Sequence, residues 1–83
     1  MIQEVKEQAI LWAKDFLPQN VTDYNELVSA VTSDPDWYVK NRCHFEFGMW
    51  FRNKMRDAGF GEKQMKVDNL DDHYVEVVEK AVK

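Results

Sequence analysis

The chain has 83 residues, a formal net charge of −4 and a sequence pI near 5.0. A domain of this length buries only roughly 60–65% of the surface that its unfolded chain exposes, so it holds one modest core. Its apolar content of 45% and aromatic content of 13% are too high for a disordered chain. We therefore expect a single globular domain over residues 1–83.

The composition excludes several classes of protein. A single cysteine, Cys43, excludes an intramolecular disulfide framework, and two histidines give no Cys/His set at zinc-finger spacing. The first seventeen residues carry five charges and so lack the apolar core of a signal peptide. No apolar run is long enough to cross a bilayer. We expect a cytoplasmic protein without a membrane role, and nothing in the sequence implies a metal or another cofactor.

The charge is distributed unevenly along the chain. Residues 1–37 sum to −5, residues 38–56 to +4 and residues 57–83 to −3. A basic middle between acidic flanks favours internal complementarity, in which the central element packs between acidic ones. An external anionic partner is the alternative explanation.

Apolar residues at helical spacing predict a first helix that stops at Leu17, because Pro18 disfavours the helical conformation in the residue before it. A turn over 18–20 follows. Thr22 or Asp23 then caps a second helix, and Glu26, three residues after Asp23, completes a capping-box pattern. The buried face of this helix is expected to hold Tyr24, Leu27, Val28 and Val31.

The segment 32–36 is the next interruption, with proline suited to a first helical turn. We expect a break within 40–42 and then a main helix that ends at Ala58, because Gly59 suits a left-handed C-cap. Residues 60–68 are expected to form a loop. The last helix is expected to begin at Asp68 or Asn69.

These elements predict an all-α fold, a compact bundle of about four helices around a central aromatic-rich helix. The alternative is a strand over 43–51, where apolar residues also alternate. No second convincing strand is present to pair with it, and one strand alone is not a structure. The expected core residues are Trp12, Phe16, Leu27, Val31, Phe47, Phe51, Val77 and Val78.

The central helix is predicted to have two apolar sides. One is a wide stripe made of Cys43, Phe47, Trp50, Phe51, Met55 and Ala58, and the other places Phe45 and Met49 together with Arg52 and Arg56. Exposed Phe, Met and Arg side chains are enriched at interfaces. If the chain has a binding surface, we expect Phe45, Met49, Arg52 and Arg56 on it, facing a protein partner. Internal complementarity also predicts an ion pair from Arg52 to Asp71 or Asp72.

Two other functions remain open at this stage. The basic and aromatic segment 40–56 has the residue types that contact phosphates and stack bases, although a nucleic-acid-binding domain is usually basic overall. His44 is a candidate general base for a small enzyme, but helix neighbours point about 100° apart, so adjacent Cys43 is not automatically its nucleophile. The acidic residues near Asp68 lack the glycine and distal glutamate of a calcium loop.

The run from His44 to Asn53, HFEFGMWFRN, resembles the pattern H-F-x-x-G-x-W/Y-x-R-N of a family of small, mostly bacterial proteins that have no assigned function. In that family an acidic pair follows just inside a last helix, and Asp71-Asp72 is similar to it. The resemblance covers mainly the second half of the chain and implies a fold but no activity. It implies that Gly48 permits close approach of another helix and that Arg52 reaches the acidic pair.

Overall fold

The computed structural model describes residues 3–39, 46–71 and 73–83. These residues form α-helices and one 3₁₀ helix, and no strand occurs within them. The prediction of an all-α bundle with four main helices is confirmed. The elements are α1 (Gln3–Asn20), α2 (Tyr24–Ser33), the 3₁₀ helix η1 (Trp37–Val39), α3 (Phe47–Asp57), the single-turn α4 (Glu62–Met65) and α5 (Tyr74–Val82).

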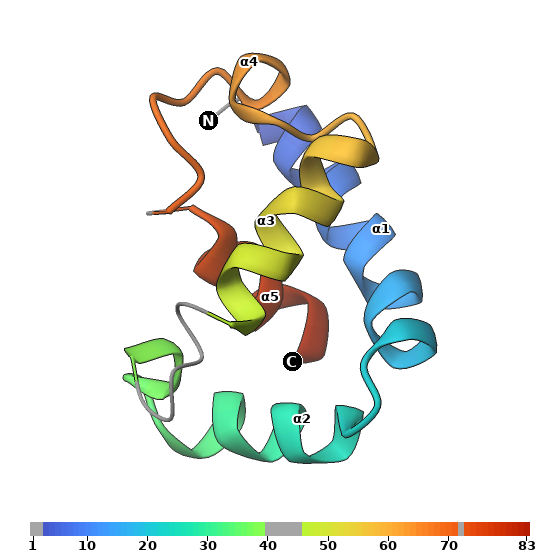
Figure 1. Ribbon diagram of the computed structural model, residues 1–83, viewed down its shortest axis with the longest axis vertical. Coiled ribbons are helices and arrows are strands. Elements are labelled where there is room, and N and C mark those ends of the chain that lie inside the picture. The colour runs from blue at the N-terminus through green and yellow to red at the C-terminus, as the bar shows by residue number, and fades with distance from the viewer. Residues whose placement is uncertain (1–2, 40–45, 72) are drawn as a thin grey trace.

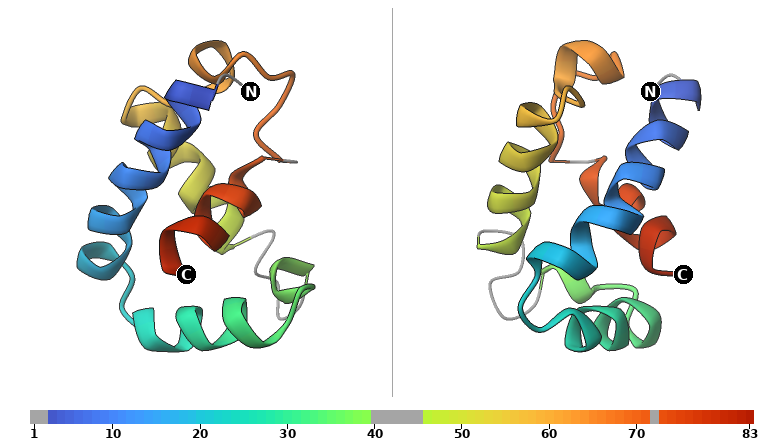
Figure 2. Two further views of the ribbon diagram at one scale, coloured as in Figure 1. Left: turned by 180° about the vertical axis from the view of Figure 1, so that it is seen from behind. Right: turned by 90° about the vertical axis from the view of Figure 1, so that its right-hand side faces the viewer.

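Helices α1, α3 and α5 surround the core on three sides, and α2 runs across one end of this group (Figure 1). The short α4 lies at the opposite end. The two other views agree on this arrangement (Figure 2), in which α5 contacts both α1 and α3. The most extensive contact between helices joins α1 and α5, so the two ends of the chain pack together.

The first helix continues past Pro18 to Asn20, so the expectation that it stops at Leu17 was wrong. Pro18 lacks an N–H donor and its ring crowds the carbonyl four residues earlier, but the helical hydrogen bonds resume after it: the backbone N–H of Val21 donates to the Leu17 carbonyl at 2.9 Å. Leu17 itself has no exposed surface. Packing of this side chain therefore outweighs the preference of a residue before proline for an extended conformation.

Helix α3 ends as expected. Gly59 has a φ of +92°, the backbone N–H of Phe60 donates to the Met55 carbonyl at 2.7 Å, and that of Gly59 donates to the Arg56 carbonyl at 3.2 Å. This pair of bonds is a Schellman motif, in which glycine adopts the left-handed conformation without a Cβ penalty. This helix begins at Phe47, with Glu46 as its N-cap residue, so it starts later than the break expected near 40–42 implied. Residues 40–45 themselves lie outside the described residues.

Three expectations along the chain need correction. The predicted loop over 60–68 contains α4, because the buried side chain of Met65 anchors one helical turn to the core. The last helix begins at Tyr74, later than the expected start at Asp68 or Asn69. A turn precedes it, in which the backbone N–H of Tyr74 donates to the Leu70 carbonyl at 2.9 Å. Asp23 is the N-cap residue of α2, but its side chain makes no capping hydrogen bond.

The core is aromatic on the side where α1 meets α3. The Phe51 ring lies 5.6 Å from that of Trp12 and 5.7 Å, nearly parallel, from that of Phe47. Four of the expected core residues are buried: Val31, Phe51, Val77 and Val78. The other four are partly buried and pack against the core: Trp12, Phe16, Leu27 and Phe47.

Truncation of Phe51 tests this core. Phe51→Ala should lower the free energy of unfolding by about 3–5 kcal/mol, because it removes a fully buried ring between two stacked neighbours. Urea denaturation followed by circular dichroism measures the change. Leu11→Ala is the control, since the Leu11 side chain is 65% exposed and its loss should change stability by less than about 0.5 kcal/mol. Equal effects of the two substitutions would contradict the assignment of Phe51 to the core.

Candidate functional site

Arg52 lies inside the fold, at the junction of α3 with the turn before α5. Arg52 is only 8% exposed, and its Nε lies 3.0 Å from Oδ1 of Asp71. Its guanidinium carbon lies 5.0 Å from the centre of the Tyr74 ring, a cation–π contact. The ion pair expected from Arg52 to the acidic pair is therefore present with Asp71, whereas Asp72 lies outside the described residues.

Gly48 explains how α3 comes this close to α5. A Cβ at this position would lie 2.6 Å from Oη and 2.9 Å from Cζ of Tyr74, and 3.2 Å from Nη1 of Arg52. Only a residue without a side chain fits there. Gly48 and Arg52 are four residues apart, so they lie on the same face of α3, which is the face turned toward Tyr74.

Arg56 is held by a second, exposed set of polar contacts. Its Nε and Nη2 donate to the two carboxylate oxygens of Glu62 at 3.0 and 2.7 Å, and its Nη1 donates to Oδ1 of Asn53 at 2.9 Å. This bidentate pair lowers the pKa of the Glu62 carboxyl from 4.5 to about 2, chiefly through the hydrogen bonds from Arg56. The same contact raises the pKa of Arg56. The guanidinium is thus fixed in one orientation at the protein surface.

The four residues expected on one binding face do not share it. Met49 is 52% exposed and the Arg56 side chain 40% exposed, so both lie on the outer face of α3. Arg52 is buried and does not contribute to that face, because it lies one helical turn after Gly48 on the inner side. Phe45 lies outside the described residues. The outer face of α3, as the structure defines it, consists of Met49, Asn53 and Arg56.

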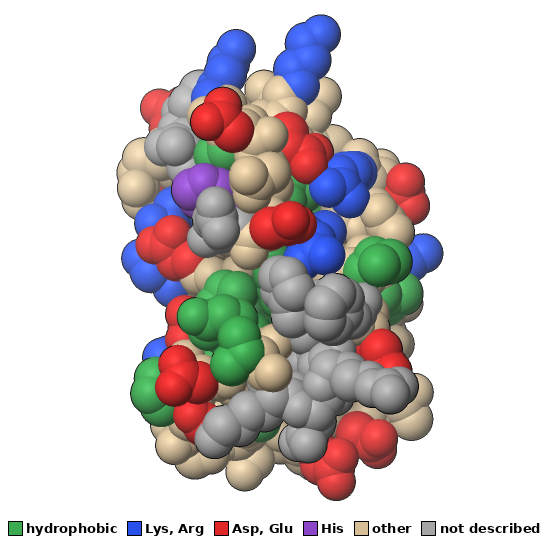
Figure 3. All heavy atoms as spheres, turned by 60° about the vertical axis from the view of Figure 1, so that its left-hand side comes forward, with side chains coloured by type: hydrophobic (Ala, Val, Ile, Leu, Met, Phe, Trp, Pro, Cys, Tyr) green, Lys and Arg blue, Asp and Glu red, His purple; other side chains and the backbone are tan. Residues whose placement is uncertain are grey.

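Two arginines of the central segment are neutralised within the molecule. Arg52 pairs with Asp71, and Arg56 pairs with Glu62. On the face shown in Figure 3, acidic and basic side chains are interspersed. The internal complementarity expected from the charge distribution is therefore realised at these two pairs, and both arginines have fewer free donors for phosphate groups.

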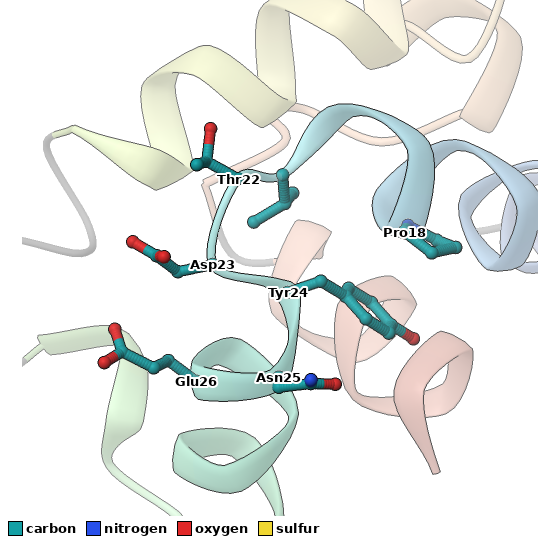
Figure 4. Close-up of a pocket in the computed structure, with 7 residues that line it drawn as sticks. Pro18, Thr22, Asp23, Tyr24, Asn25 and Glu26 are labelled. Carbon is teal, nitrogen blue, oxygen red and sulfur yellow. The ribbon is translucent and has the colours of Figure 1, made fainter.

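A hollow of about 480 Å³ opens between α2, η1 and the start of α3. Its acidic members include Asp23 and Glu26, whose carboxylates project to the same side in Figure 4, away from the Tyr24 ring. From the sequence, both residues were expected to form a capping box at the start of α2. The lining residues are Val21, Asp23, Glu26, Leu27, Ala30, Trp37, Glu46 and Phe47.

Two smaller hollows are also present, and the first adjoins the large one, with which it shares Val21, Asp23 and Glu26. One, of about 380 Å³, follows the turn between α1 and α2 and is the pocket drawn in Figure 4. The other, of about 260 Å³, lies between Tyr38 and α5, where Glu76 forms ion pairs with Lys6 and Lys80. These pairs lower the pKa of Glu76, chiefly through the hydrogen bond from Lys6. In the second of these hollows, the charge of Glu76 is thus already paired within the chain.

Within residues 3–39, 46–71 and 73–83, no group of three or more His, Cys, Asp or Glu side chains could hold a metal ion. The same ranges contain no helix long and apolar enough to cross a membrane. His44 and Cys43, the candidate base and its neighbour, lie outside them.

Comparison with protein-family models, with curated proteins and with solved structures finds no match to this chain. The resemblance in the segment 44–53 therefore stays at the level of a motif. The evidence for function comes from the surface itself.

The close contact at Gly48 predicts that a larger residue at this position lowers the stability of the protein. Gly48→Ala should destabilise the protein by about 1–3 kcal/mol, because the new Cβ overlaps the Tyr74 hydroxyl. This loss exceeds the gain of about 1 kcal/mol that alanine has over glycine inside a helix. Tyr74→Phe in the same chain should restore part of the stability, since it removes the nearest atom.

Gly61→Ala is the matched control for this substitution. The nearest atom to a Cβ at position 61 is Oε1 of Gln64 at 3.1 Å, the end of a flexible side chain that can move away. Thermal melting of these three variants and of the parent protein measures the effect. A Gly48→Ala protein that melts at or above the temperature of the parent would show that α3 and α5 do not approach as described.

Proposed function

We propose that this chain is a small protein-interaction module that binds a partner protein through the outer face of α3. The observation that carries the proposal is the pairing of an exposed apolar side chain, Met49, with a rigidly held arginine, Arg56, on this face. Methionine and arginine are enriched at protein interfaces, and methionine adapts to differently shaped partners. By its place in the sequence, Phe45 is expected to extend this surface.

Pre-organisation supports the role of Arg56. An interface must order the side chains it uses, at about 0.5–1.5 kcal/mol for each flexible one. The contacts with Glu62 and Asn53 have already fixed Arg56 in the free protein. Its planar face and aliphatic stem therefore reach a partner with a smaller entropy loss than an unrestrained arginine.

Nucleic-acid binding is the second candidate, based on the basic and aromatic residues of the segment 40–56. It is less well supported, because Arg52 and Arg56 each pair with a carboxylate of the same chain. The chain also has a net charge of −4. A small enzyme centred on His44 is the third candidate and rests on that residue alone.

The outer-face proposal is tested with purified protein and a partner captured from the native host. Met49→Asp and Arg56→Ala should each weaken the binding of that partner by about tenfold or more, as measured by calorimetry. Leu11→Asp is the control, since Leu11 is an equally exposed apolar residue on α1. Unfolding curves should show little change for all three variants. Full affinity in Met49→Asp would exclude the outer face of α3 as the binding surface.

Salt dependence separates the two leading candidates. Titration with single- and double-stranded oligonucleotides at 50 and 200 mM salt should give no saturable binding, whereas protein binding should change only mildly over this range. Saturable oligonucleotide binding that weakens steeply with salt would favour the nucleic-acid function.

A further inference from the structure

We propose that the hollow between α2, η1 and the start of α3 is a second binding site, which takes an extended peptide segment that carries a lysine or arginine next to apolar side chains. This site is separate from the outer face of α3 and uses none of its residues. Two properties of the hollow support the assignment: an apolar lining, and a rim on which Asp23 and Glu26 carry negative charge without an ion pair to any described residue.

The lining is mainly aliphatic and aromatic. Leu27 and Ala30 contribute from α2, Trp37 from η1 and Phe47 from the first turn of α3. The volume of about 480 Å³ falls in the range typical of ligand sites, about 300–1,000 Å³. Such walls favour the burial of apolar side chains and exclude a bare hydrated cation as the natural occupant.

The rim carries negative charge that no ion pair among the described residues neutralises. Asp23 and Glu26 make no ion pair with any described residue, although Asp71, Glu62 and Glu76 elsewhere in the chain do. The two rim residues are three apart at the start of α2, so their Cβ atoms are about 5–6 Å apart, and both carboxylates project to the same side (Figure 4). One ammonium or guanidinium group can contact both. A phosphate-bearing ligand would be repelled.

Trp37 provides a readout for the hollow. The residue is 2% exposed and lines the hollow, so a ligand bound there changes the environment of its ring. An extended peptide brings apolar side chains and a cation together, and these are the two kinds of group that the lining and the rim favour.

The test uses two blocked tripeptides as probes, Ac-Leu-Arg-Leu-NH₂ and Ac-Leu-Glu-Leu-NH₂, titrated to about 10 mM into the ¹⁵N-labelled protein. The arginine peptide should cause saturable shifts of the Trp37 indole resonance, identified by its loss in Trp37→Phe, and of backbone amides in α2. The glutamate peptide should not. Absence of saturable shifts with the arginine peptide, or equal shifts with both peptides, would overturn the proposal.

Variants locate the binding. Asp23→Asn combined with Glu26→Gln should weaken the arginine peptide about fivefold, because both carboxylates contact the cation. Ala30→Leu should also weaken it, since an exposed helix position that lines the hollow then carries a larger side chain. Met49→Asp, on the outer face of α3, should leave it unchanged. If the rim and Ala30 variants bind normally, or if only Met49→Asp loses binding, the hollow is not the site, whatever the outcome for the outer face.

Discussion

The buried cation of Arg52 is the constraint on which the arrangement of α3 and α5 depends. An arginine inside a small core carries a desolvation penalty of several kcal/mol, so it needs a partner fixed in place. Asp71 provides the charge and Tyr74 the aromatic face, and both belong to the turn and helix at the end of the chain. Gly48 permits the approach that brings these groups together. The helix and the C-terminal segment therefore specify each other's position.

The ion pairs within the chain also determine which charged side chains remain free to bind a partner. Arg52 and Arg56, two of the basic residues in the middle of the sequence, are each bound to a carboxylate of the same chain, as is Lys6 in α1. What remains at the surface is an apolar and arginine-bearing face on α3 and an acidic, apolar-walled hollow beside α2. Both suit polypeptide partners better than nucleic acid, since phosphate binding requires free cations.

Sequence reasoning found the fold and the central ion pair because both follow from local patterns. Helical periodicity, the glycine at position 59 and the excess of charge in the middle are visible in a single chain. It placed Arg52 on an exposed face because a helical wheel gives the relative orientation of side chains and not which side meets a neighbouring helix. The pair of Arg56 with Glu62 crosses a turn whose shape depends on the burial of Met65. The hollow depends on how α2 crosses the end of the bundle, which no local pattern encodes.

The most direct test is a double-mutant cycle on Arg52 and Asp71, measured by urea denaturation. Asp71→Asn should destabilise the protein by about 1–3 kcal/mol, because it leaves a buried guanidinium without its charged partner. Combining it with Arg52→Met removes that unpaired charge, so the double variant should be more stable than Asp71→Asn alone, with a coupling energy of about 1–3 kcal/mol. A coupling energy below about 0.5 kcal/mol, with the two effects simply adding, would show that the ion pair does not hold α3 against the C-terminal segment.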